Sequence, residues 1–252
     1  MSRQHDTPAD ADGDPRAPVG ELVARLVADP AEPDRGSRGR ELRSLTRALA
    51  LSARGAGRAS VLGGRWLTDL MVDTAPRIPS RDLATLQAQH PGLDREDLAQ
   101  TLISGAAKAS AAVGAAGGVL AAVEFAAPPT LLSAPAQIAG ETLLIAAIEV
   151  KLIAELHEVY GVPVPATPGR RAAAYLVAWT NRRGLDPLDP AGLKLSLGAA
   201  AKAALRRRLI RRAGRNLSTM GPLMSGAVAG SIINHRETRR LGEQVRADLR
   251  SR

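Results

Sequence analysis

The side chains of this chain that could do chemistry gather in one apolar stretch, residues 101–160. They are four carboxylates and one imidazole: Glu141, Glu149, Glu155, Glu158 and His157. Carboxylates near an imidazole can bind a metal ion or transfer protons. Their spacing contains neither His-x-x-x-His nor Glu-x-x-His, the patterns that put two metal ligands on one helix face. We therefore expect no metal site and no catalytic residue here. We expect these carboxylates to form ion pairs with arginines of the last third of the chain.

Three polar residues are candidates for burial among apolar neighbours. Glu141 lies deep in the apolar stretch and is the best single candidate for a buried carboxylate with a function. Glu124 lies earlier in the same stretch. A buried charge is costly, so each carboxylate needs an Arg, a Lys or a helix N-terminus as partner. Asn234 is expected at the junction of two helices, where it would cap a helix or bond a helix end.

Signatures of known catalytic classes are missing from the sequence. There is no Gly-x-Ser-x-Gly and no P-loop, and the Gly pairs at 63–64 and 117–118 lie in helical runs rather than after strands. The chain has no Cys, which excludes disulfides and thiolate metal sites. We therefore predict a non-enzymatic protein without cofactors. A hydrolase with a carboxylate site at Glu141 and Glu149 is a third hypothesis, beside the two given at the end of this section.

The elements that must position these residues are helices. Residues 94–127 and 130–160 are rich in Ala, Leu, Ile, Val and Gly, and Pro128 and Pro129 separate them. Two consecutive prolines remove two backbone donors and stop a helix. No strand-like alternation persists for more than about four residues. The sequence predicts an all-α fold, a multi-helix bundle around a long Ala/Gly-rich helical hairpin.

Two Gly-x-x-x-Gly pairs lie in apolar helices: Gly114 with Gly118, and Gly226 with Gly230. Such pairs put small residues on one helix face, which lets two helix backbones approach closely. Aromatic residues are only 2% of the chain, so the core must be built by close helix approach rather than by large rings. We expect a C-terminal hairpin, residues 217–250, to dock its glycine face on the central hairpin, against Gly114 and Gly118.

The whole chain divides into three parts. Residues 1–18 are polar, acidic and proline-containing, and they predict a disordered tail without a secretory signal. Residues 19–92 should form helices packed on the core, and residues 93–250 should form the main helical domain. Outside the central hairpin, helices are expected at about 19–28, 37–55, 61–72, 80–90, 169–183, 191–213, 217–233 and 235–249.

The positive charge is concentrated in the last third. Residues 168–252 carry 18 Lys or Arg against 5 Asp or Glu, in a chain of net charge +9. Basic amphipathic helices lie on anionic membranes, although a core helix can also have a basic outer face. Non-specific nucleic-acid binding is the weaker alternative, because there is no helix-turn-helix or zinc motif and almost no aromatic residue to stack on bases. The predicted anionic-surface contacts are Arg206, Arg207, Arg208, Arg211, Arg212 and Arg215.

Two apolar runs fall short of a membrane span. Residues 217–233 are 17 uncharged residues with a proline, and residues 109–123 are 15 uncharged residues dominated by Ala and Gly. A spanning helix needs about 20 apolar residues. The turn at 125–135 is almost entirely apolar, which is unusual for a loop facing water. This tip is expected to be covered by the protein itself, or placed in lipid or against a protein partner.

Three stretches together resemble the EcsC family of bacterial proteins. They are a Gly-Gly in an apolar helix followed by an acidic residue, a helix ending in Tyr-Gly, and a Pro-x-x-x-Gly-x-x-x-Gly stretch with a following Asn, Thr and Gly. The residues concerned are Gly117, Gly118, Glu124, Tyr160, Gly161, Pro222, Gly226, Gly230, Asn234, Thr238 and Gly242. The family often has Asp where Glu124 stands. The resemblance covers roughly residues 95–250 and implies no activity. One namesake is encoded beside an ABC transporter, which implies an auxiliary role linked to the membrane.

The first hypothesis is therefore a non-enzymatic cytoplasmic protein, peripheral to the inner face of the cell membrane. It would contact an anionic membrane surface or a membrane protein complex through residues 206–215 and the apolar tip. It would assist a transporter or an envelope complex. The second hypothesis is a soluble interaction module whose tip at 125–135 binds a protein partner.

Overall fold

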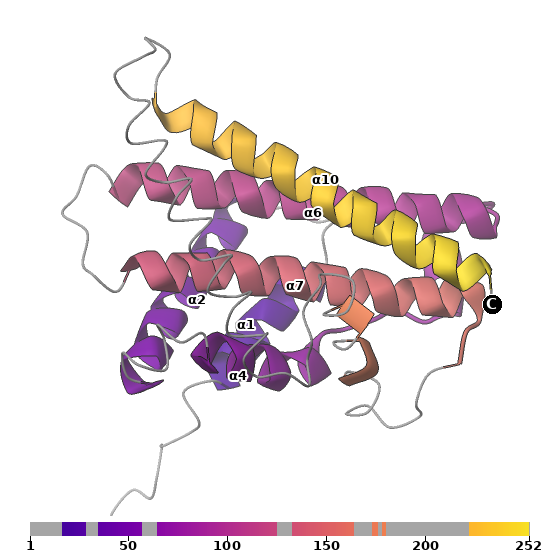
Figure 1. Cartoon of the computed structure of the whole chain (residues 1–252), viewed down its shortest axis with the longest axis horizontal. Coiled ribbons are helices and arrows are strands. Elements are labelled where there is room, and N and C mark those ends of the chain that lie inside the picture. The colour runs from indigo at the N-terminus through magenta and orange to yellow at the C-terminus, as the bar shows by residue number, and fades with distance from the viewer. Residues whose placement is uncertain are drawn as a thin grey trace, which may run out of the picture.

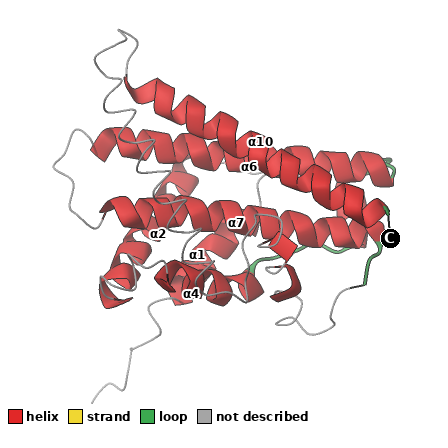
Figure 2. Cartoon of the chain, viewed as in Figure 1, coloured by secondary structure: helices red, strands yellow, loops and turns green. Residues whose placement is uncertain are grey.

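The computed structural model of the chain describes residues 17–28, 35–56, 65–124, 133–163, 173–175, 178–179 and 222–251. Every regular element within these ranges is helical, so the predicted all-α fold is confirmed (Figures 1 and 2). The elements are α1 (Ala17–Ala28), α2 (Arg35–Ala56), α4 (Arg65–Thr74), the 3-10 helix η1 (Ala75–Arg77), α5 (Leu83–Gln89), α6 (Arg95–Glu124), α7 (Ser133–Tyr160) and α10 (Pro222–Arg250).

The predicted central hairpin is formed by α6 and α7, which lie side by side and antiparallel (Figure 1). The carboxylate of Asp94 begins α6, because its Oδ1 accepts a hydrogen bond from the amide of Asp97 at 2.8 Å. Gly161 ends α7 with φ of 64°, a left-handed conformation that favours glycine at a helix end. Residues 125–132 connect the two helices and lie outside the described residues, as does most of the apolar tip.

The third long helix, α10, packs along α6 and also contacts α7 (Figure 1). The prediction of two helices meeting near Asn234 is wrong, because residues 222–250 form one continuous helix. No proline or glycine lies between Ile233 and Thr238 to interrupt it. The Asn234 side chain does not cap a helix end; its amide donates to Glu141 Oε1 on α7 at 3.2 Å.

α6 and α10 approach each other closely at two glycines. A Cβ atom added to Gly114 would lie 2.6 Å from the carbonyl oxygen of Gly230. A Cβ added to Gly230 would lie 2.9 Å from the carbonyl oxygen of Gly114. Further along α10, a Cβ at Gly242 would lie 2.8 Å from the side chain of Ile103. Because the first of these contacts is with backbone, no rotamer change could make room for a side chain.

α7 occupies the middle of the molecule and is buried on all sides. Its side chains from Leu143 to Leu156 are almost all buried, including Leu152 and Ile153. A helix that is apolar around its whole circumference must be covered on every face. α6 and α10 cover one side of α7, and α1, α2 and α4 cover the other (Figure 1).

The N-terminal helices are attached to this core by apolar packing and by hydrogen bonds. Val19 and Val23 of α1, Leu49 of α2 and Leu70 of α4 are completely buried and belong to the same apolar core as α7. The described helices before residue 92 therefore share their apolar core with the central hairpin. The short helix α5 begins at Asp82, whose Oδ1 accepts from the amide of Thr85 at 2.8 Å.

The glycine contact predicts a clear difference between two Gly→Ala substitutions in α6. Gly114→Ala should lower the free energy of unfolding by about 1–3 kcal/mol, because the methyl group meets backbone atoms of α10. Gly105→Ala is the matched control: nothing lies within 4 Å of its added Cβ, and it should raise stability by about 0.5–1 kcal/mol through helix propensity. Urea unfolding followed by circular dichroism measures both. Equal effects at the two positions would contradict a close contact at Gly114.

Candidate functional site

The buried carboxylate at the centre of the bundle is Glu149, whose side chain has no exposure to solvent. Its Oε1 accepts a hydrogen bond from Thr238 Oγ1 at 2.8 Å, and its Oε2 accepts from Trp179 Nε1 at 2.7 Å. The Thr238 hydroxyl also lies 2.9 Å from Ser110 Oγ. A hydroxyl has one proton, so Thr238 donates to the carboxylate and accepts from Ser110. The chain of bonds joins α6, α10 and α7 through one carboxylate.

A second buried carboxylate, Glu155, links α7 to the N-terminal part. Arg81 Nε and Nη2 bind its two oxygens at 2.8 and 2.9 Å, a bidentate geometry that is strong for this pair. Lys151 Nζ lies 3.7 Å from Glu155 Oε1 and donates at 3.2 Å to the carbonyl oxygens of Val27 and Ala28, the last residues of α1. A cation at a helix C-terminus also interacts favourably with the helix dipole.

We expected these carboxylates to pair with arginines of the last third of the chain. This prediction is wrong for Glu155, because its arginine partner is Arg81. Glu141 and Asn234 bond each other but are half-buried, so the prediction that they are the buried polar residues is also corrected. Among the described residues, the buried acids are Glu149 and Glu155 instead. For Glu149, its position between apolar residues on every helix face was the signal available in the sequence.

The other predicted positions divide between those that the structure brings together and those that it does not describe. Gly114 and Gly230 are in contact, as given above. The backbones of Gly118 and Gly226 lie in α6 and α10. Their surroundings, the side chain of Glu124 and the arginines of residues 206–215 lie outside the described residues.

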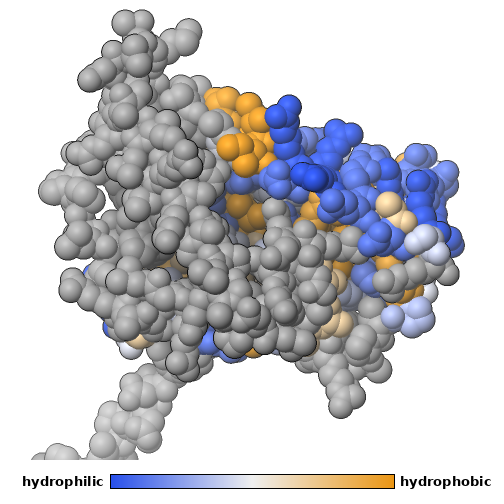
Figure 3. Space-filling model, viewed as in Figure 1, coloured by the Kyte–Doolittle hydropathy of each residue, from blue (hydrophilic) through white to orange (hydrophobic). Residues whose placement is uncertain are grey.

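The outward face of α10 changes character along its length. Its first part exposes Val228, Ile232 and Ile233, which are 50%, 50% and 38% accessible. The next turns expose Arg236, Arg239 and Arg240, and Figure 3 shows hydrophilic surface adjoining an apolar patch on this face of the molecule. Arg239 lies 3.7 Å from Glu243, an exposed pair of little strength. We call this surface the α10 outer face; it consists of Val228, Ile232, Ile233, Arg236, Arg239 and Arg240.

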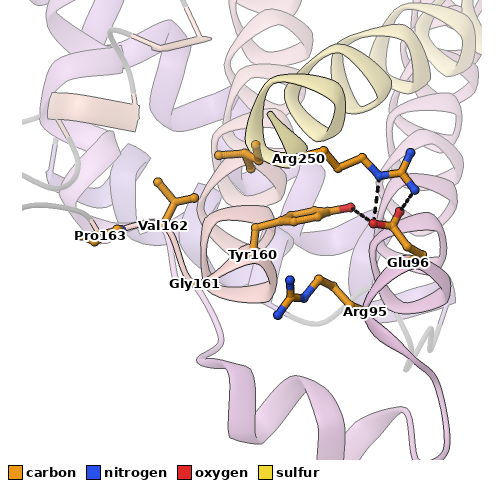
Figure 4. A pocket seen from close by; sticks show the side chains of 8 residues that line it. Arg95, Glu96, Tyr160, Gly161, Val162, Pro163 and Arg250 are labelled. Carbon is orange, nitrogen blue, oxygen red and sulfur yellow. Dashed lines mark hydrogen bonds and ion pairs between the residues drawn. The ribbon is translucent and has the colours of Figure 1, made fainter. Parts of the chain in front are cut away.

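A pocket of about 690 Å³ lies where α6 begins and where α7 and α10 end (Figure 4). We call it the end pocket. Arg250 Nε donates to Glu96 Oε1 at 2.8 Å, its Nη2 pairs with the other oxygen, and Tyr160 donates to Oε1 at 3.0 Å. The lining residues are Arg95, Glu96, Tyr160, Gly161, Val162, Pro163, Leu249 and Arg250.

The contacts of the end pocket set the charges of its titratable groups. The hydrogen bond from Arg250 lowers the pKa of Glu96, although partial burial opposes this. Burial and the hydrogen bond to Glu96 raise the pKa of Tyr160. At neutral pH the carboxyl is therefore ionised and the phenol keeps its proton.

The described part of the chain contains no group of three or more His, Asp or Glu side chains that could hold a metal ion. Likewise, none of the helices within the described ranges is both long and apolar enough to cross a membrane. Comparisons with protein-family models, curated proteins and solved structures found no match to the chain. The resemblance to the EcsC family therefore stays a prediction.

Removing the Thr238 hydroxyl should be costly because it leaves Glu149 Oε1 without this donor. We expect Thr238→Val, which keeps the side-chain shape, to lower the free energy of unfolding by about 1–3 kcal/mol. Thr101→Val, at an exposed position of α6, is the matched control and should change it by less than about 0.5 kcal/mol. Denaturant titration measures the difference. Similar small values for both variants would contradict a stabilising role of the bond.

The end pocket predicts a pH-dependent contribution of Glu96 to stability. Its pKa is lower in the folded than in the unfolded chain, so the ionised carboxylate stabilises the fold above its unfolded value, about 4.3. This stabilisation is lost as pH falls through the lowered folded pKa. The stability difference between wild type and Glu96→Gln should therefore be largest near neutral pH and shrink below about pH 4. Arg250→Gln provides the control, because in that background Glu96→Gln should have a smaller effect at neutral pH.

Proposed function

We propose that this chain is a non-enzymatic protein that attaches peripherally to an anionic membrane surface, the inner face of the cell membrane. The observation that carries the proposal is the α10 outer face, which combines exposed Val228 and Ile232 with the exposed Arg236, Arg239 and Arg240 on one helix. Apolar side chains beside a group of arginines suit the boundary between headgroups and acyl chains.

The energies of such a contact support reversible attachment. Each Lys or Arg near an anionic surface contributes about 1 kcal/mol. Full burial of a Val or Ile side chain contributes about 1.5–3 kcal/mol, and partial insertion contributes less. Neither source alone gives stable binding, which usually needs two signals. The α10 outer face supplies both within a few turns of one helix.

The sequence next to the helix ends also supports membrane contact at the end of the bundle where α10 begins. The N-terminal end of α10 lies at the same end of the bundle as the end of α6 and the beginning of α7 (Figure 1). In the sequence, the apolar residues 125–132 follow Glu124, and six residues separate Arg215 from Pro222. In the sequence, the arginines of residues 206–215 precede the beginning of α10, and the apolar tip joins the end of α6 to the beginning of α7. These three helix ends are the ones nearest the exposed apolar side chains. An auxiliary role for a transporter or an envelope complex rests on the EcsC resemblance.

Sedimentation with vesicles tests the proposal on the full-length chain. Arg236→Gln/Arg239→Gln/Arg240→Gln should weaken binding to vesicles containing phosphatidylglycerol by about tenfold or more, given about 1 kcal/mol per arginine. Val228→Ser/Ile232→Ser should also weaken it, because less apolar area inserts. The matched control is Arg40→Gln/Arg43→Gln/Arg47→Gln, which removes the same charge from exposed positions of α2 and should bind as wild type does.

Several outcomes would reject this mechanism. One is equal loss of binding in the α2 control, because net charge alone would then explain attachment. Equal binding to neutral phosphatidylcholine vesicles is another. Replacing Arg206, Arg207, Arg208, Arg211 and Arg212 with Gln should also release the chain from anionic vesicles, and unchanged sedimentation would exclude residues 206–215 from the contact. Co-purification with a soluble protein, together with no vesicle binding, would favour the interaction-module alternative.

A further inference from the structure

We propose that the end pocket binds a small ligand with one oxyanion group, a carboxylate or a phosphate ester, and a compact apolar body. The pocket lies at the opposite end of α10 from Val228 and Ile232 (Figure 1). It is therefore a site separate from the proposed membrane contact. Its volume of about 690 Å³ is within the range of about 300–1,000 Å³ that small-molecule sites usually have.

The cation available to an oxyanion is Arg95. Its side chain extends beside the ring of Tyr160, and no interaction with the other drawn residues reaches it (Figure 4). Within the described part of the chain it forms no hydrogen bond or ion pair. A guanidinium presents several donors in one plane and binds carboxylates and phosphates through two bonds at once. Among the described residues, the guanidinium of Arg95 therefore has no partner at the wall of this cavity.

The remaining charges of the pocket leave it with one excess positive charge. Among the described lining residues Glu96 is the one acid, and Arg250 neutralises it through Nε and Nη2. Tyr160 stays protonated at neutral pH, because burial and the bond to Glu96 raise its pKa, so it adds no negative charge. The net charge of the lining is therefore that of Arg95. This balance favours a small anion over a cation.

The apolar part of the lining is on the other side of the pocket. Val162 and Pro163 lie there, away from Arg95 (Figure 4), and Leu249 also lines the pocket. Gly161 has no side chain to narrow this wall, and its φ of 64° disfavours replacement by a larger residue. A ligand that bonds Arg95 with its oxyanion can place a small apolar body against this wall. Inorganic ions would use only half of the site.

Calorimetric titration with benzoate, phenyl phosphate and benzyl alcohol tests the proposal on the full-length chain. Both anions should bind saturably, and benzyl alcohol, which has the ring but no charge, should bind at least about tenfold more weakly, as expected for loss of a charge-assisted bond. Arg95→Gln should weaken benzoate by about tenfold for the same reason. Arg47→Gln, which removes another exposed arginine, on α2, should leave affinity unchanged.

Glu96→Gln provides a test in the opposite direction. It frees Arg250 from its carboxylate partner, so affinity for benzoate should rise by about three- to tenfold, whereas a variant that merely disturbed the pocket would lose affinity. Circular dichroism at neutral pH verifies that each variant is folded. Phosphatidylglycerol vesicles added as competitors distinguish two sources of the ligand. If the pocket takes a lipid headgroup, the vesicles displace phenyl phosphate. If it takes a soluble ligand, phenyl phosphate stays bound.

Three results would overturn the proposal. The first is no saturable binding of either anion. The second is equal weakening by Arg95→Gln and Arg47→Gln, which would mean attraction to the net charge of the chain. The third is unchanged or weaker benzoate binding in folded Glu96→Gln, because the charge balance of the pocket would then not control its affinity.

Discussion

The contact between Gly114 and Gly230 is the constraint on which the rest of the bundle depends. Carbonyl groups of the two helices approach to distances that leave no room for a methyl group. At this separation short side chains can bridge the helices, and the hydroxyls of Ser110 and Thr238 lie 2.9 Å apart. With larger residues at the two glycines, the helices would stand farther apart and these short bonds would be broken. The polar centre of the molecule thus follows from the glycines.

The burial of Glu149 shows how this close packing tolerates a carboxylate. An isolated buried charge is very costly, whereas one that accepts several hydrogen bonds costs much less. Thr238 and Trp179 each donate to a different oxygen of Glu149. Glu155 is instead bound by an arginine that donates to both of its oxygens. One carboxylate therefore attaches α7 to α10, and the other attaches it to Arg81 in the segment before α5.

Periodicity and helix breakers were sufficient to predict the helical fold and most helix ends. Asp82, Asp94 and Gly161 act locally, through bonds to amides a few residues away or through their own φ, so their effect can be recognised in sequence. The partners of the carboxylates could not be predicted, because they come from residues 74 and 89 positions away along the chain. The role expected for Asn234 was wrong for the same reason: its partner Glu141 belongs to another helix.

The arginines of α10 fall into two groups: those bonded to other side chains of the fold, and those without such a bond among the described residues. Towards the C-terminus, Arg246 and Arg250 are bonded to Gln100, Glu243 and Glu96. In the middle of the helix, Arg236 and Arg240 have no such bond among the described residues. The inward face of α10 is already occupied by packing on α6 and α7, so the exposed Val228 and Ile232 contribute little to the core. Exposed arginines and exposed apolar side chains therefore share one surface of α10, where packing among the described residues does not use them.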